Sequence, residues 1–279
     1  MIGIIDVSHN ITGIYGAGVL DYYAEHNISF DYGAGVSSGG TNLVSYFSKN
    51  PGQSFLYYND FALRNDYLNV KKTFEDTNAL DIDLLFEDKF SDFLDYPFPL
   101  DQTGTYGIKI HIVATDALTG EPHYFNITEK TADRLAILKA SSNIPVYNEP
   151  YNLGDASFFA GYLSDPLPFQ KAFEEGCDKV ILILARPLTY RRDSLRDRIL
   201  SRLLKTRQPE LSKAVRNLSK TYNDSIYEAL RLQKEGKMLI LSPELHTPLY
   251  SIIRDRKELS TLYQKGRQDA ESTVEFLTK

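Results

Sequence analysis

The stretch Gly35-Val36-Ser37-Ser38-Gly39 has the pattern G-x-S-x-G and lies between a predicted strand, Ile28–Gly33, and a predicted helix, Gly40–Ser48. In this setting the serine occupies a sharp strand-to-helix turn, and the two glycines let neighbouring backbone pass without a Cβ clash. The N-terminal N–H groups of the helix point to the region beside the serine, where they can stabilise an oxyanion. The sequence therefore predicts a nucleophile elbow with Ser37 as the nucleophile.

Two elements before the elbow complete a βαβ unit. Ile2–Asp6 is a short apolar run rich in β-branched residues, which is typical of a central parallel strand. A polar loop follows at Val7–Thr12, and the apolar spacing of Gly13–Glu25 predicts a helix that packs on the sheet. Such crossovers are right-handed, and this order of elements predicts an α/β fold with a parallel sheet.

The rest of the chain continues the α/β pattern and ends in helices. Predicted strands are Ile108–Thr115, Pro122–Ile127, Lys179–Ala185 and Met238–Ser242, with a hairpin at Tyr151–Phe159. Predicted helices are Glu129–Ala140, Leu167–Glu175, Asp193–Lys205, Glu210–Lys234 and Glu258–Thr278, and residues 54–95 read as a helical insertion. No repeat or Pro/Ser-rich linker interrupts the sequence. We therefore expect a single domain over 1–279, with an α/β core at 1–190 and a mostly helical tail at 191–279.

Composition and charge exclude several classes of protein. The 42% hydrophobic and 24% charged content is ordinary for a globular protein, and no apolar run approaches the roughly 20 residues of a membrane span. The N-terminus lacks the basic region and long apolar core of a signal peptide, and the single cysteine, Cys177, allows no internal disulfide or thiolate cluster. The net charge of −6 argues against a nucleic-acid partner. We expect a cytoplasmic protein without metal or cofactor, and the oligomeric state is left open.

Several ordered motifs resemble those of the patatin-like phospholipases, in particular bacterial patatin-family proteins. The similarity covers nearly the whole chain. The matching motifs are the first strand and helix (Ile2–Val7, Gly13–Asp21), the second strand and elbow (Phe30–Tyr32, Gly35–Gly39), a segment near the family's active site (Lys139–Ser142, Ile144-Pro145), and the run after the family's catalytic aspartate (Leu163–Pro168, Ala172–Val180, Arg186-Pro187).

This resemblance implies both a fold and a chemistry. The fold is a three-layer α/β/α arrangement with a mainly parallel central sheet and a helical C-terminal region. The chemistry is hydrolysis of lipid acyl esters by a Ser–Asp dyad: the serine forms an acyl-enzyme, which water then releases, and one aspartate acts as the base. A glycine-rich loop after the first strand supplies the N–H groups of the oxyanion hole. A lipid or acyl ester is therefore the expected ligand.

The loop after the first strand departs from the family pattern. The family has Gly-Gly-Gly-x-Arg-Gly, whereas this chain has Ser8-His9-Asn10-Ile11-Thr12-Gly13, so that only Gly13 is retained. Glycines serve at these positions because the backbone must approach the substrate oxygen closely. The new side chains are expected to project toward the space that the substrate carbonyl needs.

The aspartate motif departs as well. In the family, Asp-Gly-Gly or Asp-Gly-Ala begins five residues before the position of Asp165, and here the same register gives Ala160-Gly161-Tyr162. Asp155 is the nearest upstream acid, but it falls at the tip of the predicted hairpin and out of register. Loss of one member of a catalytic dyad typically costs about 10³–10⁴ in rate. We therefore expect activity to be lost or strongly reduced.

Two alternatives to the hydrolase interpretation stay open. The protein could be a non-catalytic pseudoenzyme that binds a lipid or a partner in the old acyl groove, or a weak esterase in which His9, the only histidine that the fold places near the elbow, replaces the base. A basic stretch also has two interpretations. It is either the solvated face of a helix or a surface for anionic lipid head groups, which would allow peripheral membrane contact. Its residues are Arg191, Arg192, Arg196, Arg198, Arg202, Lys205 and Arg207.

Overall fold

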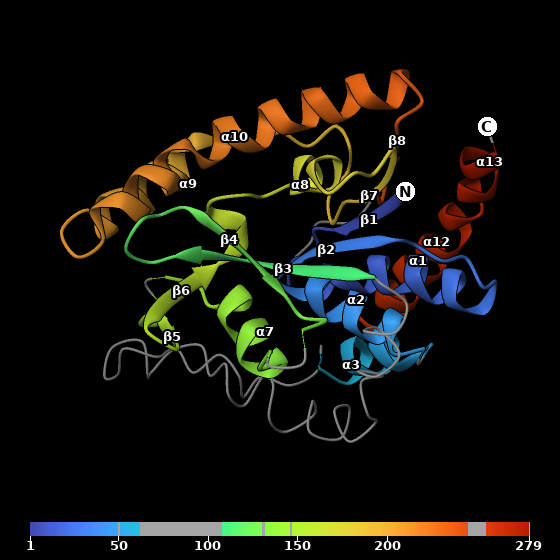
Figure 1. The fold of residues 1–279 in the computed structure, drawn as a ribbon, viewed down its shortest axis with the longest axis horizontal. Coiled ribbons are helices and arrows are strands. Elements are labelled where there is room, and N and C mark those ends of the chain that lie inside the picture. Colours follow the sequence, from blue (N-terminus) through green and yellow to red (C-terminus); the bar gives the residue numbers. More distant parts are fainter. Residues whose placement is uncertain (50, 62–107, 130–131, 146, 245–254, 279) are drawn as a thin grey trace.

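A mostly parallel central sheet organises the chain in the computed structural model, which describes residues 1–49, 51–61, 108–129, 132–145, 147–244 and 255–278 (Figure 1). The strand order is β5-β6-β3-β2-β1-β7-β8, and β4 pairs with β3. The strands are β1 (Ile2–Asp6), β2 (Tyr32–Val36), β3 (Lys109–Asp116), β4 (Pro122–Asn126), β5 (Tyr151–Leu153), β6 (Ala156–Ala160), β7 (Lys179–Ile183) and β8 (Met238–Leu241). The five strands from β3 to β8 in this order are parallel, whereas β4, β5 and β6 pair antiparallel.

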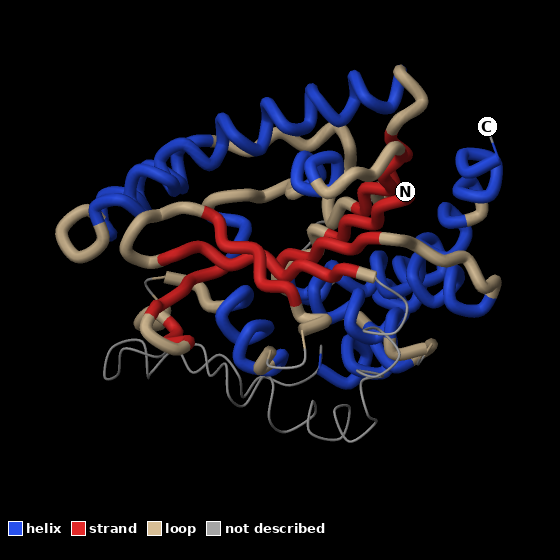
Figure 2. Tube along the Cα trace, viewed as in Figure 1, coloured by secondary structure: helices blue, strands red, loops and turns tan. Residues whose placement is uncertain are grey.

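Helices cover both faces of this sheet and make it the middle of three layers (Figures 1 and 2). On one face lie α1 (Gly13–Glu25), α2 (Ser38–Phe47), α3 (Gln53–Phe61), α7 (Arg134–Ser142) and α12 (Arg256–Ala270), which leads into α13 (Ser272–Thr278). On the other face lie α8 (Phe169–Glu174), α9 (Ser194–Leu204) and α10 (Pro209–Lys234). Short 3₁₀ turns, η1 (Asn10–Thr12) and η2 (Gly161–Leu163), follow β1 and β6.

The central strands are mostly apolar because both faces of the sheet are buried. Along β1, Ile4 belongs to the core under α1, α2 and α12, whereas Ile5 belongs to the opposite core under α8 and α10. Successive strand residues point to opposite faces, so a strand covered on both sides needs a continuous apolar run. No helix in the described part of the chain combines the length and hydropathy of a membrane span.

The predicted α/β fold with a mainly parallel sheet and a helical C-terminal region is confirmed, and the predicted bounds of β1 and α1 are those observed. Local errors remain. The strand expected at Ile28–Gly33 begins only at Tyr32, which pairs with Gly3. The helix expected from Glu129 begins at Arg134, because the Asp133 side chain caps it by accepting the Ala136 N–H.

The expected C-terminal helix Glu258–Thr278 is two helices, and Glu271 separates them. The first helix begins early, because the Asp255 side chain accepts the N–H groups of Lys257 and Glu258. Most of the insertion expected at 54–95 lies outside the described residues, which include only α3 of that segment. The division into a core at 1–190 and a tail at 191–279 stays a prediction.

The helices α1 and α12 cross through two glycines that leave no room for a side chain. A Cβ on Gly18 would lie 2.1 Å from the carbonyl oxygen of Tyr263, and a Cβ on Gly266 would lie 2.1 Å from that of Tyr15. Each glycine thus lets the backbone of the other helix approach. This contact ties the C-terminal helices to the helix that follows β1.

We expect Gly18→Ala to destabilise the protein by about 1–3 kcal/mol, because the added methyl group must push α12 away. Alanine is a better helix former than glycine by up to about 1 kcal/mol, so helix propensity alone predicts that Gly18→Ala stabilises the protein. Urea unfolding monitored by circular dichroism measures the effect. Gln264→Ala, on the exposed side of α12, is the control and should change stability by less than about 0.5 kcal/mol. A more stable Gly18→Ala variant would contradict the close crossing.

Candidate active site

Ser37 links β2 to α2 in a backbone conformation that serine rarely adopts. Its φ is 53° and its ψ is −126°, and a non-glycine residue with a positive φ of this kind is strained. Two hydrogen bonds hold it there: the Ser37 N–H donates to Ser141 Oγ over 3.0 Å, and its carbonyl accepts the Gly40 N–H over 2.9 Å. The surroundings therefore determine the turn, and the sharp strand–turn–helix geometry is that of a nucleophile elbow.

The flanking glycines are required by packing. A Cβ on Gly35 would lie 2.5 Å from the Gly40 Cα, and a Cβ on Gly39 would lie 2.1 Å from the Asp6 carbonyl oxygen. Both distances are too short for any real side chain. Of the two residues between the glycines and Ser37, Val36 is a buried residue of β2 and Ser38 is the first residue of α2.

Ser141 couples the elbow to the neighbouring strand. Its hydroxyl accepts the Ser37 N–H and donates to the Val113 carbonyl of β3 over 2.6 Å. The residue is buried at the end of α7. Sequence patterns give Ser141 no role beyond its place in the Lys139–Ser142 motif, because its partner lies 104 residues away in the chain.

Ala160 lies beside the elbow on the same edge of β3. Val36 pairs with Val113 of β3, and Ala160 pairs with the next residue, Ala114. The opposite edge of β3 is occupied by β4 along this stretch, so β2 and β6 must share one edge and approach each other end to end. The position that the family resemblance gives to the aspartate thus lies next to Val36, the residue before Ser37, along the edge of β3, but it holds a buried methyl group.

The loop from Ser8 to Gly13 runs past the elbow at the carboxyl end of β1. The Ser8 carbonyl accepts the Gly39 N–H over 3.3 Å, and Thr12 Oγ1 donates to the His9 carbonyl over 2.7 Å. Asn10, Ile11 and Thr12 form η1, and Ile11 is part of the core. Gly13 has its own packing requirement, since a Cβ there would lie 2.2 Å from the Tyr58 hydroxyl.

A buried hydrogen-bond network under the elbow is centred on Asp6, which the sequence analysis did not single out. Its carboxylate accepts the Ser8 N–H and an Asn42 Nδ2 hydrogen, each over 2.9 Å. The Asn42 side chain also donates to the Gly13 carbonyl and accepts from the Tyr58 hydroxyl, each over 2.9 Å. Burial raises the pKa of Asp6 to about 6. The available sequence signal was an acid at the end of an otherwise apolar strand.

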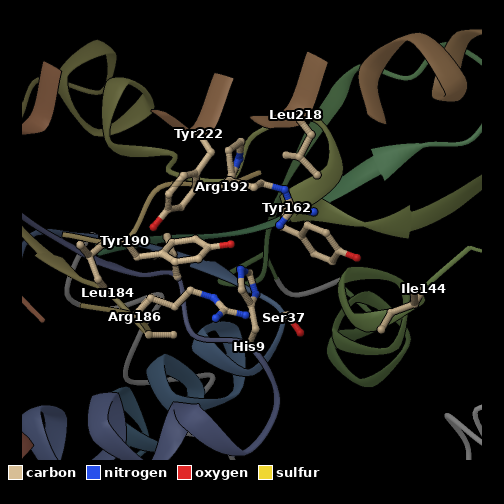
Figure 3. A pocket seen from close by; sticks show the side chains of 13 residues that line it. His9, Ser37, Ile144, Tyr162, Leu184, Arg186, Tyr190, Arg192, Leu218 and Tyr222 are labelled. Atoms are coloured by element: carbon tan, nitrogen blue, oxygen red, sulfur yellow. The ribbon is translucent and has the colours of Figure 1, made fainter. Parts of the chain in front are cut away.

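A cavity of about 180 Å³ lies beside Ser37 (Figure 3). Its lining residues are Val7, His9, Ser37, Ile144, Tyr162, Pro166, Leu184, Ala185, Arg186, Tyr190, Arg192, Leu218 and Tyr222. They include two arginines and no carboxylate. The cavity therefore combines the elbow serine with apolar walls and positive charge.

His9 lies in this cavity in a position unfavourable to its charged form. Its ring packs edge-on against Tyr162 with centroids 5.1 Å apart, and its buried Nδ1 has no hydrogen-bond partner among the residues that the structure describes. Burial, assisted by the positive charges of Arg186 and Arg192, lowers the pKa of His9 to about 3. The imidazole is therefore neutral at physiological pH.

The other described histidines lie away from the cavity. His111 is buried with its Nδ1 3.0 Å from the Tyr32 hydroxyl, His26 stacks on Tyr22, and His123 contacts Phe125. Within the described ranges, no three His, Cys, Asp or Glu side chains come together in a way that could hold a metal ion. The fifth histidine, His246, lies outside the described residues.

The raised pKa of Asp6 predicts a specific dependence of stability on pH. Because the folded-state pKa of about 6 exceeds the usual aspartate value of 3.8, this carboxyl stabilises the fold at low pH, and that stabilisation is lost as pH rises through 6. We expect the stability of the wild type relative to Asp6→Asn to fall by about 2 kcal/mol between pH 4 and pH 7. Urea unfolding at several pH values measures it. Asp155→Asn, at an exposed hairpin tip, controls for the removal of one carboxylate. If the stability of the wild type relative to Asp155→Asn fell equally with pH, the pH dependence could not be assigned to Asp6.

Comparison with known proteins places this geometry in a family. The sequence model of the patatin-like phospholipases matches residues 11–173, and that of a domain of unknown function, DUF6363, matches residues 208–279. The crystal structure of VipD from Legionella pneumophila is similar with a TM-score of 0.49 and 11% identity, over 98% of this chain and 66% of that one. A search of curated proteins gives no match. Since the first match covers more than half of the 279 residues, the chain belongs to the patatin-like phospholipase family.

Proposed function

We propose that this protein binds a lipid acyl chain or acyl ester in the cavity beside Ser37, and that hydrolysis through Ser37 is lost or strongly reduced. The observation that carries the proposal is the pairing on β3: the elbow is intact, but Ala160 occupies the adjacent position where the family resemblance implies the base. A methyl group can neither take the serine proton nor orient the hydroxyl. Apolar lining residues such as Ile144, Leu184 and Leu218 suit an acyl chain.

His9 is a poor substitute for the missing base. A general base is most effective when its pKa lies near the working pH, and the pKa of His9 is about 3. Proton transfer from Ser37 would create an imidazolium close to two guanidinium groups. A weak esterase that uses His9 is the second candidate, and it is favoured only by the shared cavity.

The loop after β1 is equally unsuited to its family role. The N–H of Ser8, at the first of the three replaced glycines, already donates to the Asp6 carboxylate. That N–H is therefore not available to a substrate oxyanion. Loss of one oxyanion donor alone typically costs about 10²–10³ in rate.

Repair of the base and of the loop tests this proposal. We expect the wild type to hydrolyse p-nitrophenyl esters no faster than Ser37→Ala. Ala160→Asp alone, or glycine at positions 8–10 with Thr12→Arg alone, should gain little. The combined variant should exceed the sum of both gains, because dyad and oxyanion hole act in one transition state. The measurement is kcat/KM for all four proteins, with Ala160→Asn as the matched control for Ala160→Asp.

Two outcomes separate the candidates. A wild type as fast as the combined variant would overturn the loss of activity. Wild-type activity that rises as His9 loses its proton, and that disappears in His9→Ala, would establish the weak-esterase alternative.

We further propose that α9 makes peripheral contact with anionic membranes. Leu195, Ile199 and Leu203 repeat every fourth residue and are 56%, 51% and 63% exposed, whereas the opposite face of α9 packs on α10. Arginines flank this ridge at 196, 198 and 202. Residues 191–207 carry seven basic and two acidic side chains, a net charge of +5 in a chain of −6. An apolar ridge between arginines fits a bilayer with anionic head groups.

Vesicle sedimentation tests this contact. We expect binding to phosphatidylglycerol-containing vesicles that weakens with salt and falls at least about tenfold when the three ridge residues become serine. Leu118→Ser, which removes an exposed apolar side chain in the β3–β4 turn, is the control and should bind normally. Equal binding to neutral vesicles, or a change of oligomeric state in the ridge variant, would overturn the proposal in favour of a protein partner.

A further inference from the structure

Two arginines reach the cavity beside Ser37, and only one of them is neutralised. Arg192 forms a bidentate ion pair with Asp197, with Nε and Nη2 2.9 and 2.7 Å from the carboxylate oxygens. Asp197 is only 1% exposed. Asn223 of α10 fixes the Arg192 backbone by accepting its N–H and donating to its carbonyl. Arg192 is therefore a rigid wall of the cavity whose charge is balanced.

Arg186 is the unbalanced charge. Its guanidinium stacks over the Tyr190 ring, 4.7 Å from the centroid, and within the described residues it has no hydrogen-bond or ion-pair partner. Tyr190 is held in turn by edge-on packing against Tyr222. Stacking on an aromatic ring orients the planar group and leaves its N–H donors for another partner.

The charge of the cavity sets the charge of its ligand. With Arg192 paired to Asp197 and no carboxylate among the lining residues, one positive charge remains in a space of about 180 Å³. In Figure 3, Arg186, Tyr190 and His9 gather in one part of the cavity, with Ser37 beside them. A ligand with one negative charge would neutralise this part of the site, and an oxyanion matches the fork of a guanidinium.

We infer that Arg186 forms a subsite for a monovalent oxyanion head group, a carboxylate or a phosphodiester, on a ligand whose acyl chain occupies the cavity. This rests on the proposed function, because it names the head group of the ligand that the cavity takes. The subsite selects free fatty acids or phospholipids over neutral glycerides. Arg186 belongs neither to the elbow motif nor to the aspartate motif, which carry the hydrolytic chemistry of the family.

His9 provides a built-in reporter for this subsite. The titratable and charged groups around its ring are Arg186, Arg192 and Tyr162, with Asp197 behind Arg192. An oxyanion on Arg186 would offset one of the two charges that oppose the imidazolium. The pKa of His9 should therefore rise above about 3 when an anionic ligand binds, and it should respond less to a neutral ligand.

Calorimetric titration of the full chain tests the inference with four probes: decanoate, decanoyl-lysophosphatidylglycerol, monodecanoylglycerol and inorganic phosphate. We expect both anionic amphiphiles to bind the wild type roughly tenfold or more tightly than the neutral glyceride. Arg186→Gln should remove this preference by weakening the anionic amphiphiles much more than the glyceride. Lys213→Gln, on the exposed surface of α10, removes a positive charge elsewhere and should behave as the wild type. Nuclear magnetic resonance of ¹⁵N-labelled histidine should show the rise in the pKa of His9.

The four probes separate this inference from the function on which it rests. Equal affinity for anionic and neutral amphiphiles, or equal weakening of both by Arg186→Gln, would overturn the subsite while the acyl cavity stands. Binding of phosphate that depends on Arg186, without binding of any amphiphile, would support the subsite and overturn the acyl-binding function. No binding of any probe would overturn both.

Discussion

The meeting of β1 and α2 without room for a side chain is the constraint on which the site depends. The backbone of Gly39 presses against the Asp6 carbonyl, and Gly35 presses against Gly40 in the same way. Between these two contacts the chain makes a tight turn at Ser37, which has a positive φ. The turn is then tied to β3 through Ser141. The two glycines of the pattern G-x-S-x-G are therefore required by packing, whether or not Ser37 reacts.

The same reasoning explains which family glycines the chain keeps. Gly13 is retained, and its position has no space beside the Tyr58 hydroxyl, which is itself bound to Asn42. Positions 8–10 carry larger residues, and the backbone N–H of Ser8 donates to the Asp6 carboxylate. Gly13, Gly35 and Gly39 thus lie where packing leaves no room for a side chain, whereas positions 8–10, which are glycine in the family pattern, hold side chains in this chain.

Sequence reasoning located the elements better than it located the contacts among them. The bounds of β1 and α1 follow from a local apolar run and a local helical period, and both were predicted correctly. Caps at Asp133 and Asp255 shifted helix starts by a few residues, because a side chain that can cap a helix also occurs within helices and loops. Ser141, the Asp6 network and the α1–α12 crossing could not be predicted, because their partners lie far away in the sequence and depend on how the elements pack.

The positive charge of the cavity bears both on the base proposed to be missing and on the anionic ligand proposed above. Arg186 and Arg192 oppose any histidine base, whose working form is cationic, but they would favour an ionised carboxylate. The positive charge of the cavity thus favours a Ser–Asp dyad over a Ser–His pair. No carboxylate is among the lining residues to balance the charge of Arg186. In the function proposed above, Ala160 leaves Ser37 without a base and the ligand itself brings the negative charge, so that one cavity binds an anionic ligand without hydrolysing it.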